Sequence, residues 1–263
     1  MANNGPTSLS VENLLAAPLR VGARDGGCDA TGLRALPENN CTGSAADAVA
    51  GFDSGAVNAD CASFCRLGRV GLHLLPKVGI EMPILERWLY GSRKPLPKNA
   101  FIAPLLAGLG AGALGLLLFY TFFLSRLPDW PVAAEAVLPV WKRFLACFYG
   151  AINEEVLARL FGFSLLLWLL RKIARQRTPQ ATPLLFWIAN VIIAVLFVLA
   201  HLPSAKVIMP ITPLLLIALF SINGLVSLMC GYLCWKRGLE AAMLAHFSTD
   251  VVVHVVGPMF FRG

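Results

Sequence analysis

The chain consists of long apolar segments separated by short polar ones, and the first of them begins about a hundred residues after the N-terminus. Five apolar segments follow one another: 101–124, 144–170, 184–200, 207–235 and 239–256. A helix needs roughly 20 predominantly apolar residues to cross a bilayer. Pro210 and Pro213 mark either a late start of the fourth segment or an added half-helix. The pattern therefore predicts an all-α, multi-pass transmembrane helical bundle of about five to six spans.

The residues before the first apolar segment divide into two parts. Residues 1–80 are rich in Gly, Ala, Asp and Asn and show no sustained hydrophobic period, which predicts a loosely structured, poorly ordered N-terminal extension. Residues 81–99 contain the short amphipathic sequence MPILERWLY, followed by prolines and basic residues. This sequence predicts an interfacial helix with Trp88 and Tyr90 at the level of the lipid headgroups. The membrane domain then covers residues 100–260.

The composition agrees with a membrane protein. Of the 263 residues, 57% are hydrophobic and 14% are charged, whereas soluble domains carry about 25% charged residues. The shortage of charge excludes a typical water-soluble enzyme and also disorder over most of the chain. The formal net charge is +7, and the basic residues stand in short clusters. Such clusters are typical of the cytoplasmic flanks of membrane helices, so we expect a lipid bilayer as partner and no nucleic acid.

The distribution of Lys and Arg predicts an orientation in the cell membrane. Nine Lys and Arg residues flank the segments on one side: Arg93, Lys94, Lys98, Arg171, Lys172, Arg175, Arg177, Lys236 and Arg237. Four lie on the other side: Arg126, Lys142, Arg143 and Lys206. Basic residues accumulate on the cytoplasmic side of membrane proteins, so we expect the N-terminus in the cytoplasm. Five spans would place the C-terminus outside, and a sixth would reverse that.

Charged residues interrupt the second apolar segment. A charged side chain near the bilayer centre costs at least about 2.5–3.5 kcal/mol, so packing alone does not explain the adjacent Glu154 and Glu155. Glu155 and Arg159 stand four residues apart and can form an ion pair along one helix face. Glu154 points about 100° away from Glu155 and is free to face a cavity. A purely structural ion pair explains Glu155 and Arg159 but leaves Glu154 without a partner.

Histidines occur in two other apolar segments. His201 ends the third segment, with Phe197 four residues earlier on the same face; taken alone, a histidine there is more often interfacial than catalytic. His246 and Asp250 stand four residues apart, a spacing that lets the aspartate orient the histidine or lets both address one atom. The alternative is a buried hydrogen-bonded pair that holds two helices together. His254 follows one turn later, and we interpret it as structural.

Glu154, His201, His246 and Asp250 together form a recognisable chemical set. Glutamate and histidine can remove a proton from water or hold a metal that acidifies it. A second histidine, with aspartate, can stabilise an oxyanion or complete a metal site. The set suits hydrolysis of an amide bond in a water-filled pocket within the membrane. Two other kinds of protein could use the same residues: a non-catalytic immunity or scaffold protein, and an ion-coupled transporter. The lack of an internal repeat and the small helix count disfavour the transporter.

Three motifs occur in order in these segments: EEVLAR at 154–159, FVLAH at 197–201 and HFSTD at 246–250. Over about residues 100–260 the chain therefore resembles the CPBP intramembrane protease family, whose motifs read EExxxR, FxxxH and HxxxN/D. This family includes the type II CAAX prenyl endopeptidases and bacteriocin-processing or immunity (Abi) proteins. The resemblance implies an endopeptidase for a membrane-associated substrate, which is prenylated in the CAAX case. It also implies that Glu155 and Arg159 support the site.

The resemblance further implies roles for the other motif residues. Glu154 and His201 would activate the attacking water. His246 and Asp250 would stabilise the oxyanion or bind a metal, so a divalent ion such as zinc, held by all four residues, is one alternative. Family members often carry Asn at the position of Asp250. An ionised aspartate cannot donate a hydrogen bond, which favours the alternative with a metal.

The depths of these residues in the membrane pose a difficulty. At about 1.5 Å per residue, Glu154 lies about 25 Å from Arg171 at the basic end of its helix, and His201 lies about 27 Å from the start of its segment. His246 lies only about 13 Å from Arg237 by the same measure. Straight, upright helices would therefore keep the site apart, and we expect tilt or a deep Arg237 to close the gap.

Overall fold

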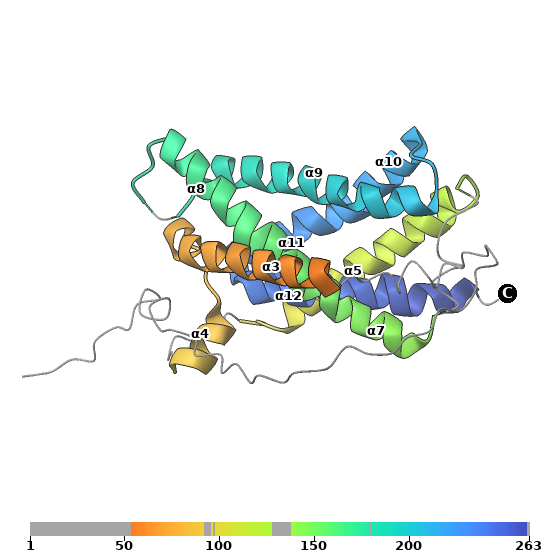
Figure 1. Ribbon diagram of the computed structural model, residues 1–263, viewed down its shortest axis with the longest axis horizontal. Coiled ribbons are helices and arrows are strands. Elements are labelled where there is room, and N and C mark those ends of the chain that lie inside the picture. The colour runs from red at the N-terminus through yellow and green to blue at the C-terminus, as the bar shows by residue number, and fades with distance from the viewer. Residues whose placement is uncertain (1–53, 92–95, 97, 128–137, 179, 262–263) are drawn as a thin grey trace, which may run out of the picture. The chain divides into compact units, whose positions relative to one another are not determined.

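The computed structural model describes residues 54–91, 96, 98–127, 138–178 and 180–261. The chain divides into two units, Met1–Ser63 and Phe64–Gly263. In the first unit, residues 54–63 form the beginning of helix α3 (Ser54–Leu74). The second unit contains the other described helices (Figure 1). The contacts given below lie within this second unit.

The described part of the second unit is helical and contains no strand, which confirms the predicted all-α fold. Several α-helices continue directly into π-helical turns. The elements that follow α3 are η1 (Pro76–Val78), α4 (Pro83–Tyr90), α5 (Ile102–Leu118), η2 (Phe119–Phe123), α7 (Val140–Tyr149), η3 (Gly150–Glu154), η4 (Val156–Phe163), α8 (Ser164–Ile173), α9 (Pro183–Ile208), α10 (Pro213–Leu219), η5 (Phe220–Gly224), α11 (Leu225–Arg237), α12 (Leu239–Asp250), η6 (Val251–Val256) and η7 (Gly257–Phe261).

Among the described residues, four helices are long and apolar enough to cross a membrane: Ile102–Phe123, Pro183–Val207, Pro213–Arg237 and Leu239–Phe260. They correspond to the first, third, fourth and fifth predicted segments. The second segment is also helical without interruption, from Val140 to Ile173. Its charged residues distinguish it from the other four. The helices thus form the multi-pass membrane bundle that the sequence predicts.

The helix boundaries near prolines agree with the prediction in one place and differ in another. α10 begins at Pro213, with the Thr212 hydroxyl capping its first turn, so the fourth segment starts late. The prediction that the third segment ends at His201 is wrong, because α9 continues to Ile208 with Pro203 inside it. A proline removes one helix hydrogen bond. The turn beyond it nevertheless packs against a hydrophobic cluster, which holds the helix in place.

The predicted poorly ordered extension, residues 1–80, needs a correction over its last part, whereas residues 1–53 lie outside the described residues. The end of α3 and η1 pack against the bundle, and Leu75, Val78 and Ile80 are buried. Gly71 permits a close approach, because a Cβ there would lie 2.5 Å from the carbonyl oxygen of Leu160. The burial of these few apolar residues is a tertiary effect that leaves no clear hydrophobic period in the sequence.

A stripe of glycines brings α5 and α12 together. A Cβ on Gly108 would lie 2.1 Å from the carbonyl oxygen of Ala245, and one on Gly112 would lie 3.0 Å from that of Thr249. The Thr249 hydroxyl donates a hydrogen bond to the Gly108 carbonyl at 3.0 Å. Small residues allow this close contact between helices. The packing fixes the position of α12, which carries two candidate site residues.

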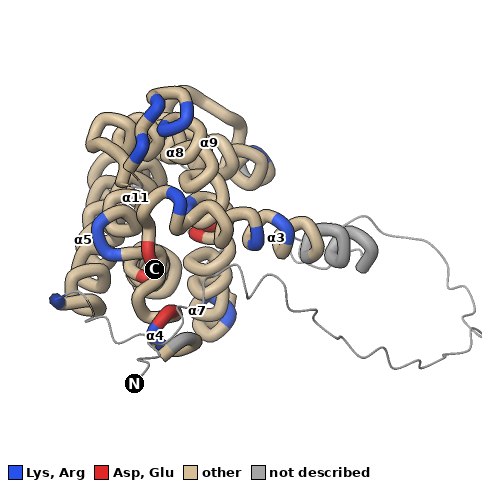
Figure 2. The backbone as a smooth tube through the Cα atoms, turned by 90° about the vertical axis from the view of Figure 1, so that its left-hand side faces the viewer, with Lys and Arg blue, Asp and Glu red and all other residues tan. Residues whose placement is uncertain are grey.

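An arginine at the end of α8 and another at the end of α11 each bind a connecting segment. The Arg171 guanidinium donates hydrogen bonds to the carbonyls of Lys77 and Thr178, and Arg237 donates to the Lys98 carbonyl at 2.8 Å. Figure 2 looks along the bundle at the end that includes the α8–α9 connection, where several Lys and Arg residues lie. These contacts agree with a shared basic end of the bundle, and its cytoplasmic orientation stays a prediction.

The predicted helix over residues 82–90 is present as α4. The Glu240 carboxylate, at the start of α12, accepts hydrogen bonds from the backbone N–H groups of Ile84 and Leu85. Trp88 is 80% exposed. The helix is therefore anchored to the bundle at its first turn and leaves its tryptophan available to the surroundings, while its interfacial position stays a prediction.

Candidate active site

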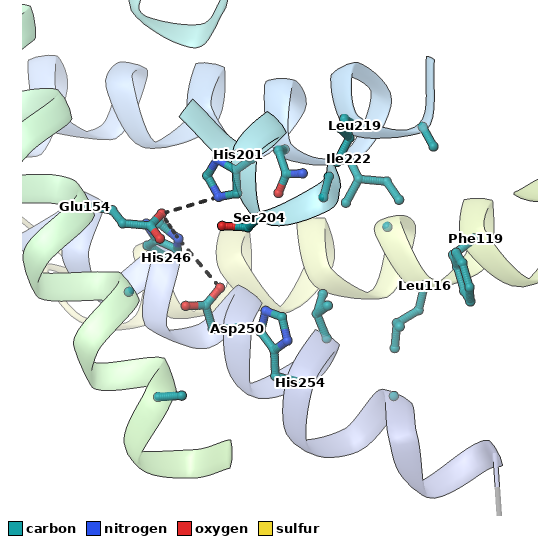
Figure 3. A pocket seen from close by; sticks show the side chains of 18 of the residues that line it. Leu116, Phe119, Glu154, His201, Ser204, Leu219, Ile222, His246, Asp250 and His254 are labelled. Carbon is teal, nitrogen blue, oxygen red and sulfur yellow. Dashed lines mark ion pairs between the residues drawn. The ribbon is translucent and has the colours of Figure 1, made fainter. Parts of the chain in front are cut away.

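The candidate residues surround a cavity of about 460 Å³ (Figure 3). Five helical stretches line it: α5 with η2, α7 with η3, α9, α10 with η5, and α12 with η6 and η7. Three of the π-helical turns contribute polar lining residues, namely Glu154 at the end of η3, Asn223 in η5 and His254 in η6. Such turns are frequent at functional sites, since they change which side chains a helix presents.

Glu154 points into this cavity. Its Oε2 atom lies 3.8 Å from Nε2 of His201 and 3.7 Å from Nε2 of His246 (Figure 3). The side chain is 34% exposed. Its described ion-pair partners are these two histidines, and Arg159 pairs with the other glutamate. The structure therefore agrees with the expectation that Glu154 is free to face a cavity.

Glu155 points to the opposite, dry side and is fully buried. Its Oε1 atom accepts a hydrogen bond from Arg159 Nη1 at 2.9 Å, which confirms the predicted ion pair. Arg159 Nη2 also donates to the backbone carbonyl and the hydroxyl of Ser227, both at 2.7 Å. The same Glu155 oxygen lies 2.7 Å from Nδ1 of His246. This last contact joins residues 91 positions apart, and helix periodicity alone cannot predict it.

The hydrogen bonds on Nδ1 decide how each imidazole faces the cavity. Nδ1 of His201 lies 2.7 Å from the Phe197 carbonyl, and Nδ1 of His246 lies against the Glu155 carboxylate. Carbonyls and carboxylates only accept, so in both histidines Nδ1 carries the proton. In the neutral state, both Nε2 atoms therefore present lone pairs to Glu154. Phe197 packs against both rings, at centroid distances of 4.6 and 5.9 Å, as predicted for His201.

Asp250 faces the same atom of His246 as Glu154 does. Its Oδ1 lies 3.6 Å from Nε2 of His246. Of the two alternatives for this pair, the structure favours the one in which both residues address one point, because Glu155 orients the imidazole through Nδ1. Gly150 makes room for the carboxylate: a Cβ there would lie 2.7 Å from Oδ2 of Asp250.

The cavity brings together all four residues of the predicted chemical set. The contact of His246 with Glu154 shows that the difference in depth is closed, as expected, while the tilt or the deep position of Arg237 that would close it stays a prediction. His254, interpreted from the sequence as structural, has its side chain at the cavity (Figure 3). Sequence reasoning missed Ser204 and Asn223, which also line it. The available signal for Ser204 was its position three residues after His201 in a helix that continues beyond the histidine.

Two groups of residues are possible metal ligands. Within the described part of the chain, donor atoms of Glu155, Cys230 and His246 lie within 4.8 Å of one another and are buried. Glu155 and His246 already bond to each other, and Glu155 also bonds to Arg159. The four cavity residues instead offer two imidazole nitrogens and two carboxylates, donors that zinc accepts. Their imidazoles also have the Nδ1 partners that metal-binding histidines usually have.

The four apolar helices indicate an integral membrane protein, and its cavity brings together two carboxylates and two histidines from separate helices. Residues 136–252 match the family model described as "Type II CAAX prenyl endopeptidase Rce1-like". The matched part contains all three motifs, which confirms the resemblance to CPBP proteases. It supports a CAAX-type intramembrane protease, with a membrane-associated substrate, in general terms. Neither curated proteins nor solved structures gave a match.

Proposed function

We propose that the protein is an intramembrane endopeptidase that hydrolyses a peptide bond of a membrane-associated substrate with a water molecule activated by Glu154 and His201. The observation that carries this proposal is the position of Glu154. Its carboxylate lies within 3.8 Å of two imidazole nitrogens, in a cavity large enough for water and a peptide segment. A carboxylate next to a histidine is a suitable general base for water.

The proposed reaction has two proton transfers. The water oxygen attacks the scissile carbonyl carbon while Glu154 takes one water proton and Nε2 of His201 accepts a hydrogen bond from the other. Glu154 then gives its proton to the leaving nitrogen, the carbon–nitrogen bond breaks, and a carboxylic acid and an amine result. The acid, which keeps the second water proton, then ionises and passes this proton to the amine. His246, held by Glu155 through Nδ1, donates from Nε2 to the oxyanion when that nitrogen is protonated. Each chemical role thus falls on an atom that faces the cavity.

A metal-assisted version of the same reaction uses the same residues. Glu154, His201, His246 and Asp250 would hold a divalent ion such as zinc, and their donor types fit it. When bound, this ion would acidify the attacking water and polarise the scissile carbonyl. Asp250 favours this version, since an ionised carboxylate contributes an acceptor and no donor. Removal of metal by a chelator, followed by addition of zinc, separates the two versions by loss and recovery of cleavage.

The cavity also supports a substrate with an apolar group, such as a prenylated CAAX-type peptide. Beyond the polar residues its lining is mainly hydrophobic and includes Leu116, Phe119, Leu215, Leu219 and Ile222. These residues lie on α5, η2, α10 and η5. An apolar chain placed there would leave the adjacent peptide bond near Glu154. Measuring kcat/KM for prenylated and unprenylated peptides of the same sequence tests this proposed preference, and the prenylated peptide should have the higher value.

Two other functions were open from the sequence, and the position of Glu154 disfavours the first of them. A non-catalytic immunity or scaffold protein would use its polar residues for helix packing, which explains Glu155, Arg159 and Ser227. It gives no reason for Glu154 to face a cavity. An ion-coupled transporter would use the carboxylates as a relay. Uptake by proteoliposomes that depends on Asp250 would favour the transporter.

The decisive experiment is cleavage of a membrane-tethered peptide by the purified full-length protein. In water enriched in ¹⁸O, wild type should give a product whose new carboxylate carries one labelled oxygen. Glu154→Gln should abolish cleavage, because the amide cannot act as a base. Glu86→Gln, the same chemical change on α4 outside the cavity lining, is the matched control and should retain activity. Full activity in folded Glu154→Gln protein would eliminate the proposed mechanism.

A further inference from the structure

A peptide-hydrolysing site must stabilise the negative oxygen that develops on the scissile carbonyl, usually with preorganised hydrogen-bond donors. Few donors are available in this cavity. Ionised Glu154 and Asp250 can only accept hydrogen bonds. The Nδ1–H groups of His201 and His246 already point to Phe197 and Glu155. Each imidazole therefore offers the cavity one ring nitrogen, and His201 uses it as an acceptor for water in the proposed reaction.

Ser204 is placed to supply a further donor. It follows His201 by three residues on α9, so the two side chains share a helix face, and Ser204 lines the cavity. Figure 3 shows its hydroxyl directed toward the part of the cavity where His201, His246 and Asp250 meet. A substrate carbonyl bound beside His246 would lie on this side of the cavity.

The Ser204 hydroxyl has no hydrogen-bond partner in the described part of the chain. Other hydroxyls in these helices donate to the carbonyl four residues earlier: Thr121 to Leu117 at 2.6 Å and Ser248 to Leu244 at 2.6 Å. Such back-bonding is the ordinary state of serine and threonine in a helix. Among the described residues, Ser204 makes no hydrogen bond of this kind or of any other. Its proton is therefore available to a substrate.

We propose that Ser204 Oγ–H donates a hydrogen bond to the oxyanion, beside Nε2 of His246. The proposal rests on the proposed endopeptidase function and adds a catalytic residue outside the three motifs. Asn223 is the other neutral donor that we considered. It lies in η5 and also lines the cavity. We assign the role to Ser204 because it shares a helix face with His201, and the experiment below separates it from Asn223.

The test compares full-length variants on a membrane-tethered peptide, with thermal unfolding measured for each. Ser204→Ala should lower kcat by about 10²–10³-fold, the usual loss for one oxyanion donor, with KM unchanged. Ser204→Thr retains the hydroxyl and should restore most of the rate. Ser248→Ala removes the same atom from a buried helix position outside the cavity lining. It is the matched control and should behave like wild type.

Binding of a phosphinate peptide, a tetrahedral anionic mimic of the intermediate, gives a second readout that does not require turnover. Ser204→Ala should weaken its binding about as much as it lowers kcat. Unchanged kcat and unchanged phosphinate binding in Ser204→Ala would overturn the role of Ser204. A loss confined to Asn223→Ala would overturn it as well. In both cases an inactive Glu154→Gln variant would leave the proposed function intact. If wild type neither cleaves the peptide nor binds the phosphinate, both proposals are wrong.

Discussion

The two sides of the helical turn that carries Glu154 and Glu155 have opposite environments, although the residues are adjacent. On the dry side, Glu155 is fully buried and bonds to Arg159 and His246 at 2.9 and 2.7 Å. On the cavity side, Glu154 is one-third exposed and faces Nε2 of His201 and His246 at 3.7–3.8 Å. His246 contacts both sides. Its Nδ1 atom bonds to Glu155 on the dry side, and its Nε2 atom faces Glu154 on the cavity side.

The comparison indicates two uses of charged residues in a membrane protein. Glu155 stabilises the packing of the helices, whereas Glu154 stays available for chemistry. A buried ion pair is costly to form, and it stabilises a fold only when its hydrogen bonds are nearly complete. On the dry side, Oε1 of Glu155 is bonded to Arg159 and His246, and Ser227 accepts two further hydrogen bonds from Arg159. The cavity side keeps looser contacts, which leave room for water and substrate. We infer that the dry side positions the imidazole of His246 and the cavity side carries the reaction.

The largest expected effect concerns the dry side. Arg159→Met should destabilise the protein by about 3–5 kcal/mol, because Glu155 is then buried without its cation. Thermal or denaturant unfolding in detergent micelles measures the loss. Adding Glu155→Gln to Arg159→Met should recover part of it, since the uncompensated charge is removed. Strictly additive losses in the two variants would mean that the residues are not coupled, against the structure.

An intermediate effect is expected where α5 packs against α12. Gly108→Ala places a Cβ against the backbone of Ala245, the residue before His246. The helices must move apart, at a cost of about 1–3 kcal/mol, and cleavage should fall because His246 moves with its helix. Gly110→Ala is the matched control, since nothing lies within 4 Å of its Cβ. It should leave stability equal or up to about 1 kcal/mol higher, from helix propensity.

The smallest effect is expected on the cavity side. Gly150→Ala would press on Oδ2 of Asp250, the end of a side chain that can shift. We expect cleavage to fall by up to about tenfold, or roughly 1.4 kcal/mol, with an unfolding temperature close to that of wild type. Gly224→Ala, whose Cβ would meet only ordinary contacts, serves as control. A large loss of stability in Gly150→Ala would show that Asp250 belongs to the packing.

Interactions within one helix could be predicted from the sequence, because helix geometry fixes them. The spacing of Glu155 with Arg159 and of His246 with Asp250 predicted that these residues meet, and they do. The same geometry indicated that Glu154 points away from Glu155 and is free to face a cavity. These predictions held although η3 and η4 are π-helical and not α-helical.

Interactions between helices could not be predicted in this way. The contact between Glu155 and His246 depends on how α12 lies against the turn at Glu155, which no periodicity encodes. The continuation of α9 beyond Pro203 also depends on packing, and it is what places Ser204 at the cavity. The burial of Leu75 has the same tertiary origin. The sequence thus indicated the candidate residues at the cavity better than the network that holds them.

The most direct test of the central claim measures peptide cleavage and the free energy of unfolding for Glu154→Gln and Glu155→Gln side by side. Glu154→Gln should lose about 10²–10⁴-fold or more in rate and unfold like wild type. Glu155→Gln should be destabilised by about 1–3 kcal/mol, the cost of buried charged hydrogen bonds that are left incomplete. The opposite pattern, with Glu154→Gln active but unstable and Glu155→Gln stable but inactive, would contradict the assignment of chemistry to the cavity side.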